Sequence, residues 1–216
     1  MSDEVPSPPA SREPSRPTNY ARSLLHCAAA SVGLTTVACV RSRAIILTIA
    51  VVFATYAWTM ELARRSSPRL NAWLMSFYES VAHAHERDHV NSGTWYATAL
   101  VLLALFASRE ATMASLAVLG VADPVAAMVG RRWGRHRIRA GRSVEGTLAF
   151  FVSGTVVAAL ALVLARGVTP GRIAGLAILS GLAGALAELV ATRVDDNLTI
   201  PVAVGGAVTA AAALLG

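Results

Sequence analysis

The sequence contains no lysine, only two cysteines and few charged residues of any kind. Charged residues make up 15% of its 216 residues, against about 25% in an ordinary soluble domain. With 55% hydrophobic residues and a mean hydropathy of +0.54, the chain is too apolar for a soluble protein. Cys27 and Cys39 lie in one apolar run and in no Cys-x-x-Cys pattern. We therefore infer no redox or zinc role for them.

Long apolar runs fill most of the chain, and two of them are interrupted by a single acidic residue. Each run has about the 17–25 residues that a helix needs to cross a bilayer. The sequence therefore predicts an all-α membrane protein with about seven transmembrane helices. The runs are 23–40, 44–60, 92–108, 111–130, 147–165, 173–192 and 198–216.

The N-terminal residues 1–19 are rich in proline and serine and nearly free of large apolar side chains. Such a composition cannot bury a core, which predicts a disordered tail. The first apolar run starts too far along the chain for an ordinary signal peptide, so we expect it to be a retained helix. Residues 20–216 then form a single helical membrane domain.

All nineteen basic residues are arginines, and their distribution predicts the orientation in the membrane. If the loop 131–142 is cytoplasmic, fourteen arginines lie on the cytoplasmic side and five on the other, as the positive-inside rule requires. The N-terminus is then cytoplasmic too. We expect no nucleic-acid partner, because the basic residues do not form a separate soluble domain. The five on the opposite side are Arg41, Arg43, Arg109, Arg166 and Arg172.

Residues 70–91, between the second and third runs, carry apolar residues at helical spacing and predict an amphipathic helix in the cytoplasmic interface. This segment also contains His85-Glu86-Arg87-Asp88-His89, which matches the H-E-x-x-H pattern of zinc proteases. Arg87 would place a positive charge beside the metal, and no third ligand follows at short spacing. We therefore interpret the segment as a charged interfacial stretch.

The stretch 120–150 concentrates features that suit phosphate binding. Asp123, followed by Pro124, interrupts an apolar run, and an intramembrane carboxylate is a candidate functional residue. Glycines and a helix start let backbone N–H groups approach an anion, and a neighbouring arginine can bind phosphate oxygens. Ser143 is the expected N-cap of the following helix, with Glu145 in its first turn. The residues of this group are Asp123, Gly130, Gly134, Arg142, Ser143, Glu145 and Gly146.

A second polar stretch, 188–201, would face the same side of the membrane. It contains Glu188 near the end of one run and an acidic turn formed by Asp195, Asp196 and Asn197, followed by Pro201. Carboxylate and amide oxygens are hard ligands of the kind that Mg²⁺ prefers. A solvated acidic turn is the alternative explanation for this pattern alone.

Two weaker pairs lie on the first two predicted helices. His26 follows Arg22 by four residues, and Arg64 follows Glu61 by three. Each pair is a candidate support for the site. The Glu61–Arg64 pair is equally consistent with a helix-end ion pair.

The segments "DPVAAMVGRRWGRHRIRAGRSVEGTLAFF" and "ELVATRVDDNLTIPV" resemble the CTP-dependent lipid kinases, the family of dolichol kinase, phytol kinase and yeast-type diacylglycerol kinase. The segments "ARSLLH", "ELARR" and "HERDHVNSGTWYA" resemble its weaker motifs, which adds Glu86 and Arg87 to the supporting residues. Where the family pattern has lysine in a Lys-Ser-x-Glu-Gly turn, this sequence has Arg142, and the two residues bind phosphate differently.

The resemblance implies a membrane kinase that transfers the terminal phosphoryl group of CTP to a lipid alcohol. Its implied partners are CTP, a divalent cation such as Mg²⁺ and a polyprenol, phytol-like or diacylglycerol acceptor. Asp123 and Asp196, helped by Asn197, would hold the metal. Glu145 would orient the nucleophile or stabilise the loop. The implied phosphate ligands are Gly130, Gly134, Arg142, Ser143 and Gly146, with Glu188 and Pro201 in support.

Two other functions remain compatible with parts of the sequence. A phosphatidate cytidylyltransferase would use the same nucleotide, metal and membrane, but its Lys/Arg-Asp and Gly-Gly signature is missing. An ion-coupled transporter could use Asp123 and Glu188, but it would need broken helices in two related halves, and the sequence shows no convincing repeat.

Overall fold

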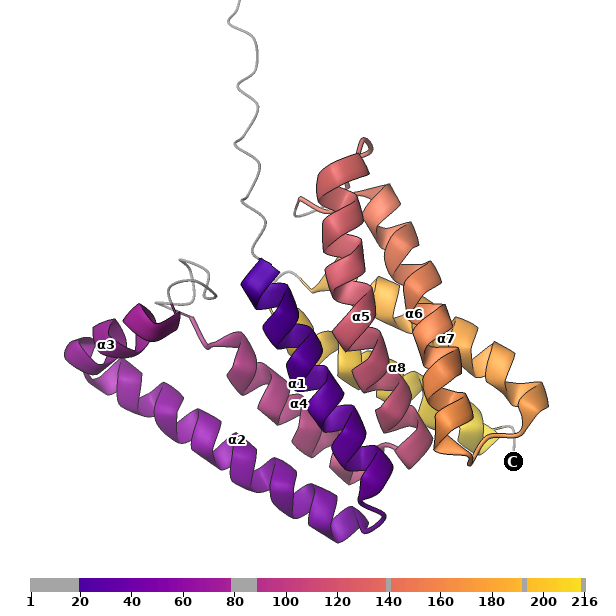
Figure 1. Cartoon of the computed structure of the whole chain (residues 1–216), viewed down its shortest axis with the longest axis horizontal. Coiled ribbons are helices and arrows are strands. Elements are labelled where there is room, and N and C mark those ends of the chain that lie inside the picture. Colours follow the sequence, from indigo (N-terminus) through magenta and orange to yellow (C-terminus); the bar gives the residue numbers. More distant parts are fainter. Residues whose placement is uncertain (1–19, 79–88, 139–140, 192–193, 215–216) are drawn as a thin grey trace, which may run out of the picture.

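A computed structural model describes residues 20–78, 89–138, 141–191 and 194–214, and these residues form eight helices without a β-strand (Figure 1). The all-α prediction is confirmed. One isolated β-bridge, between Arg137 and Ser143, closes the loop between the fifth and sixth helices. The helices are α1 (Tyr20–Cys39), α2 (Arg43–Ser66), α3 (Pro68–Tyr78), α4 (Ser92–Phe106), α5 (Arg109–Trp133), α6 (Val144–Ala165), α7 (Pro170–Val190) and α8 (Asp196–Leu214).

Polar side chains cap the first turn of several helices, because the first backbone N–H groups of a helix have no partner within it. Ser42, Asn91, Ser108 and Ser143 each accept a hydrogen bond from an N–H group in the first turn of the helix that follows. The predicted N-cap role of Ser143 is therefore confirmed. The Ser143 cap fixes the start of α6, near the end of α5.

Five helices, α2, α5, α6, α7 and α8, are long and apolar enough to cross a membrane. Two shorter apolar helical stretches, Ser23–Cys39 and Ser92–Phe106, complete the set. The expectation of about seven spans agrees with these seven apolar helices. At about 1.5 Å per residue, the 15 residues of α4 reach less far than the other spans.

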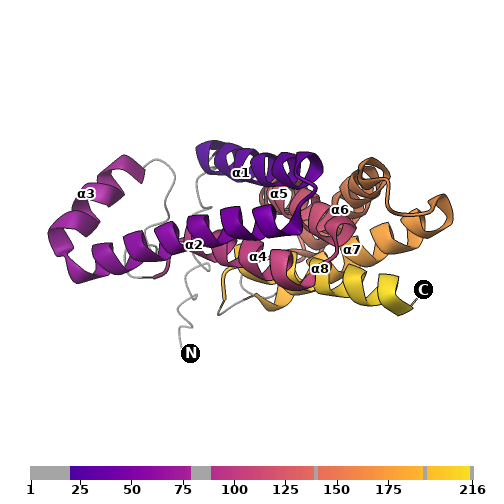
Figure 2. The ribbon, with the colours of Figure 1, turned by 90° about the horizontal axis from the view of Figure 1, so that it is seen from below.

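Helix α5 is the centre of the bundle and packs against α1, α6, α7 and α8 (Figure 2). Small residues allow the helices to approach closely. Gly120 lies against Ala30 of α1, and Gly184 of α7 lies against Phe150 of α6. Phe150 is fully buried at this junction. Close packing of small residues against their neighbours thus holds these helices together.

The predicted interfacial helix over 70–91 is represented in part by α3. Figures 1 and 2 show α3 at the far end of α2, outside the bundle. Its Trp73 is 57% exposed, as an anchor at a membrane interface would be. Residues 79–88 lie outside the described residues, and a location in the cytoplasmic interface stays a prediction.

Apart from α3, successive helices run in opposite directions across the bundle. The end of one helix therefore lies at the same side as the start of the next. Helices α1, α4, α6 and α8 begin at one side, where α2, α5 and α7 end. We call this side the acidic end, because Asp195, Asp196 and Glu188 lie there. The opposite end carries the turns 40–42, 107–108 and 166–169.

Replacing Gly120 by alanine should loosen the contact between α1 and α5. The added Cβ would lie 2.5 Å from the Cβ of Ala30, so the helices must move apart, at a cost of about 1–3 kcal/mol. The matched control is Gly206→Ala, because a Cβ at Gly206 meets no atom within 4 Å. Thermal melting in detergent should show a lower midpoint for Gly120→Ala alone. Equal midpoints would contradict this packing.

Candidate active site

Pro124 allows a backbone carbonyl of α5 to accept a hydrogen bond from α1. Proline has no N–H group, so the carbonyl four residues earlier, that of Gly120, loses its usual helical donor. The Cys27 thiol donates to this carbonyl at 3.0 Å. One residue earlier, His26 Nε2 donates to the Leu119 carbonyl at 2.9 Å. Two neighbouring side chains of α1 therefore stabilise α5 one turn before Asp123.

Three of the motif glycines meet around the hydroxyl of Ser143. A Cβ on Gly130 would lie 3.1 Å from Ser143 Oγ, one on Gly134 2.6 Å and one on Gly146 3.2 Å. Ser143 is 2% exposed, and its Oγ accepts from the Gly146 N–H at 3.1 Å. Close packing of α5 on α6 thus requires glycine at these positions, whatever ligand they bind. This packing also fixes the backbone position of Arg142, the residue before Ser143.

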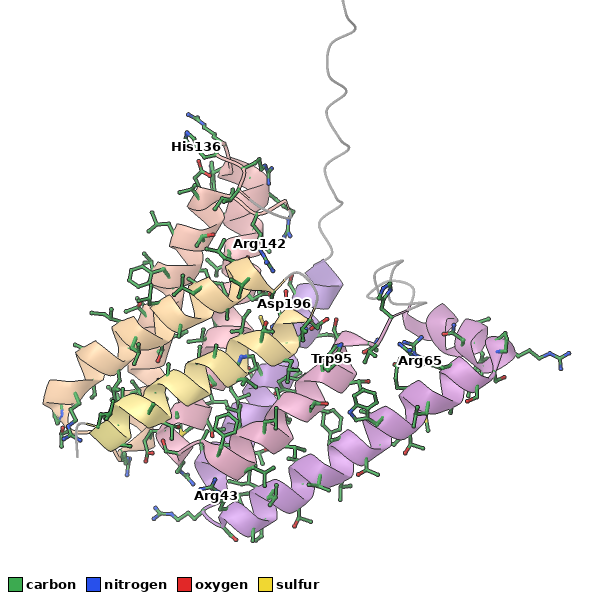
Figure 3. The ribbon with its side chains drawn as sticks, turned by 180° about the vertical axis from the view of Figure 1, so that it is seen from behind. Arg43, Arg65, Trp95, His136, Arg142 and Asp196 are labelled. Carbon is green, nitrogen blue, oxygen red and sulfur yellow. The ribbon has the colours of Figure 1, made fainter. Side chains whose placement is uncertain are left out.

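Arg142 connects the start of α6 with the end of α7 and the start of α8. Its Nε lies 2.8 Å from Glu188 Oε1, and a terminal nitrogen lies 4.0 Å from Asp196 Oδ2. A further nitrogen donates to the Ala191 carbonyl at 3.2 Å. Figure 3 shows Arg142 between the tip of its loop, marked by His136, and Asp196. The guanidinium is 18% exposed and Asp196 32%, so both can be reached from solution.

Arg142 contacts two carboxylates, those of Glu188 and Asp196, and Asp196 in turn lies near Asp123 and Asp195. We call Asp123, Glu188, Asp195 and Asp196 the acidic cluster. Asp196 interacts electrostatically with Asp123, Asp195, Arg142 and the ring of His26, and Glu188 interacts with Arg142 and Asp196. The four acids come from three different segments, α5, α7 and the turn into α8. Asp123 and Asp196, from the two sequence motifs, therefore lie near each other.

Hydrogen bonds from Asn197, and from Ser92, which the sequence analysis did not select, brace the turn before α8. Ser92, at the start of α4, donates to Asp195 Oδ2 at 2.8 Å. The backbone N–H of Asn197 donates to Asp195 Oδ1 at 2.9 Å, and its side-chain amide donates to the same atom at 2.7 Å. Pro201, one turn later, is buried in the bundle. Asp195 and Ser92 thus position Asp196.

Glu145 faces the loop before α6. The backbone N–H of His136 donates to both of its carboxylate oxygens at 3.3 Å, and His136 Nδ1 lies 2.7 Å from Oε1. Of the two predicted roles for Glu145, this geometry favours stabilisation of the loop. This loop also contains Arg142 and positions it at the acidic cluster.

The pair Glu61–Arg64 is a buried ion pair, with the two side chains 2% and 4% exposed. Arg64 donates to both carboxylate oxygens of Glu61 and also to the His89 carbonyl. The backbone N–H of Asn91 donates to Glu61 at 3.3 Å. This network anchors the chain just before α4, next to Ser92.

The predicted Mg²⁺ site at Asp123 and Asp196 stays a prediction. Within the described residues, no three His, Cys, Asp or Glu side chains form a complete metal cage. Mg²⁺, however, usually binds one or two carboxylates together with substrate phosphates. Asp123 and Asp196 supply such oxygens. Glu188 Oε2 is buried and has no hydrogen-bond partner in the described part of the chain.

Some predicted residues contribute differently or are not described. Asn197 directs its amide N–H groups at Asp195 and Asp196, so its role as a metal ligand stays a prediction. Glu86 and Arg87 lie outside the described residues, as does the side chain of Arg22. The contacts made by Cys27 and Ser92 could not be found from sequence motifs, because each depends on the packing of two distant helices.

The fold and the site define an integral membrane protein with a charged site at one end of its helical bundle. No family model and no solved structure matches the chain. Two curated proteins do. It is 27% identical over 166 residues, 66% of the chain, to CTP-dependent diacylglycerol kinase 1 of Saccharomyces cerevisiae. It is 37% identical over 84 residues, 38% of the chain, to dolichol kinase sec59 of Schizosaccharomyces pombe.

The chain is therefore related to the CTP-dependent lipid kinases, which confirms the resemblance drawn from its motifs. The match spans 56% of the length of the diacylglycerol kinase and 16% of the dolichol kinase.

Replacing Arg142 by glutamine should destabilise the fold, because Glu188 would be left as a buried charge without its partner. We expect a loss of about 1–3 kcal/mol. The double variant Arg142→Gln/Glu188→Gln should recover part of this loss, since no unpaired charge remains. Thermal melting of the two single variants and the double variant measures the coupling.

The control is Arg137→Gln, because Arg137 is exposed and, among the described residues, its side chain donates to the Gly141 carbonyl alone. Additive effects of the two substitutions, or an equal loss in Arg137→Gln, would contradict the pairing.

Proposed function

We propose that the chain is a membrane lipid kinase that transfers the terminal phosphoryl group of a nucleotide, CTP, to the hydroxyl group of a lipid. The observation that carries the proposal is the meeting of Arg142 with the acidic cluster at one end of an apolar bundle. The names of the two relatives support a lipid acceptor, and one of them supports CTP. The loop 131–142 and the N-terminus would be cytoplasmic, where the arginine distribution places them.

In this proposal Arg142 binds the phosphates of the nucleotide. Its guanidinium lies at the edge of the site, where a planar pair of donors can contact two phosphate oxygens at once. It is now held by Glu188 and the Ala191 carbonyl. Ser143 and the glycines that pack around it set the direction from which Arg142 enters the site, and the start of α6 adds a favourable dipole for an anion.

Asp123 and Asp196 would hold Mg²⁺ against the nucleotide phosphates. The bound ion would neutralise negative charge on the transferred group. Glu188 keeps Arg142 in place, and Ser92 with Asp195 keeps Asp196 in place. The cluster has more carboxyl groups than the single guanidinium of Arg142 can pair with, so a bound cation would stabilise their ionised form.

The acceptor would approach from the bilayer, with its hydroxyl at the level of Asp123 and its tail among the apolar helices. The lipid oxygen forms a bond to the terminal phosphorus, the bond from that phosphorus to the β-phosphate oxygen breaks, and the hydroxyl proton is released. The products are a lipid phosphate and CDP. Transfer of this kind depends mainly on positioning and charge neutralisation, so no covalent enzyme intermediate is needed.

The direct test supplies CTP labelled at either the γ- or the α-phosphate to the purified protein with Mg²⁺. The acceptor panel contains a polyprenol, a phytol-like alcohol, diacylglycerol and phosphatidate. We expect γ-label in one of the lipid alcohols, which also names the acceptor. ATP should replace CTP poorly. Transfer of α-label to phosphatidate would instead establish a cytidylyltransferase, and no transfer of either label would refute the kinase proposal.

Substituting Asp123→Asn or Asp196→Asn should reduce γ-label transfer by at least about a hundredfold, because each change removes a charge that stabilises the transferred group. The matched control is Glu110→Gln, at the first turn of α5 and the opposite end of the bundle. Gel filtration and thermal melting check that all variants are folded. Full activity of Asp123→Asn or Asp196→Asn would remove that residue from the site.

A further inference from the structure

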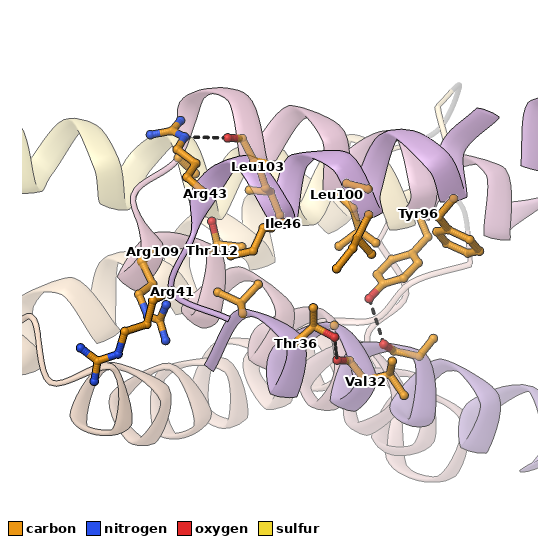
Figure 4. Close-up of a pocket in the computed structure, with 18 residues that line it drawn as sticks. Val32, Thr36, Arg41, Arg43, Ile46, Tyr96, Leu100, Leu103, Arg109 and Thr112 are labelled. Atoms are coloured by element: carbon orange, nitrogen blue, oxygen red, sulfur yellow. Dashed lines mark hydrogen bonds between the residues drawn. The ribbon is translucent and has the colours of Figure 1, made fainter. Parts of the chain in front are cut away.

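A groove of about 470 Å³ lies between α1 and α2, away from the acidic cluster (Figure 4). The two helices diverge from the turn 40–42, because α1 packs on α5 whereas α2 packs on α4. Figure 2 shows α1 above α2, with the two helices approaching each other toward the turn that joins them. The groove has the size of a small-molecule site and shares no residue with the acidic cluster.

The walls of the groove are apolar and open toward the bilayer. Val32 of α1 and Ile49 and Phe53 of α2 line it and are 68%, 47% and 39% exposed. Leu100 and Leu103 of α4 form its floor. In a membrane such a surface contacts hydrocarbon chains, so the natural occupant of the groove is a lipid tail.

The polar groups of the groove are divided between its two ends. Arg41, Arg43 and Arg109 lie at one end, and Tyr96 lies toward the other (Figure 4). The Tyr96 hydroxyl already donates to the Ala29 carbonyl at 3.0 Å. Between Tyr96 and Ala107 the floor follows α4 for eleven residues, about 16 Å. An extended acyl chain can lie along this length.

Two of the three arginines, Arg43 and Arg109, are held by backbone carbonyls at the ends of the neighbouring helices. Arg43 donates to the carbonyls of Ala104 and Leu105, and Arg109 donates to those of Ala38 and Val40. These carbonyls are neutral, and the groove lining includes no carboxylate in the part of the chain that the structure describes. Glu110, in the first turn of α5 beside Arg109, does not line the groove. The three guanidinium groups therefore give this end of the groove a positive charge.

We propose that this groove binds one anionic phospholipid of the leaflet at the opposite end of the bundle. Its phosphate contacts Arg41, Arg43 and Arg109, and one acyl chain follows α4 toward Tyr96. Guanidinium groups bind phosphate through charge-assisted hydrogen bonds, and three cations favour a headgroup with net negative charge. This lipid is not the acceptor, since its polar end lies at the side of the membrane away from the acidic cluster.

The test titrates the detergent-purified chain with phosphatidylglycerol and measures the bound lipid by native mass spectrometry. Phosphatidylcholine is the comparison lipid. We expect one phosphatidylglycerol per chain, with weaker binding of phosphatidylcholine. Arg41→Gln should weaken binding about fivefold, the effect of one basic residue near a lipid headgroup. Arg41 makes no hydrogen bond among the described residues, so its loss should spare the fold.

A second variant fills the groove instead of removing its charge. Ile49→Trp should displace the acyl chain and abolish retention of the lipid. The matched control, Arg166→Gln, removes an exposed arginine at the same end of the bundle but outside the groove. It should bind as the wild type does.

Equal weakening by Arg41→Gln and Arg166→Gln would overturn the site in favour of general surface charge. Competition by diacylglycerol or a polyprenol, with no effect of Arg41→Gln, would assign the groove to the acceptor tail. Because the readout is lipid binding, these outcomes do not depend on the proposed kinase activity.

Discussion

The ion pair between Arg142 and Glu188 is the contact on which the acidic end depends. It connects the loop after α5 to the end of α7, and through Asp196 to the start of α8. Charges are costly in an apolar bundle unless they are paired or reach water. Arg142 contacts two of the four carboxylates and so reduces that cost only in part. In the proposed function, a metal ion bound with an anionic substrate would stabilise the ionised form of the other acids.

The glycines of the central motif gain a structural explanation beside their expected role in phosphate binding. Gly130, Gly134 and Gly146 leave room for Ser143 between α5 and α6. A side chain at Gly134 would push the start of α6 away, and one at Gly130 or Gly146 would crowd it. The residue before Ser143 would then no longer reach Glu188. Packing and ligand binding therefore place the same requirement on these positions.

The sequence predicted the helical membrane fold and the two segments that form the site, because hydrophobic runs and the helix cap at Ser143 are local signals. It could not predict which side chains meet. The contact of Cys27 with the Gly120 carbonyl joins residues 93 positions apart, and that of Ser92 with Asp195 joins residues 103 apart. Both depend on the rotation of each helix about its axis, which apolar sequences specify weakly. For the same reason, the sequence did not predict the groove between α1 and α2.

The central claim is that Arg142 and the acidic cluster form one site for a metal-bound nucleotide, and its most direct measurement is equilibrium binding of CTP with and without Mg²⁺. The account predicts that the wild-type chain binds CTP only when Mg²⁺ is present. It predicts that Arg142→Gln loses this binding while Arg137→Gln, five residues away on the same loop, retains it. Equal binding by the two variants, or binding that ignores Mg²⁺, would contradict it.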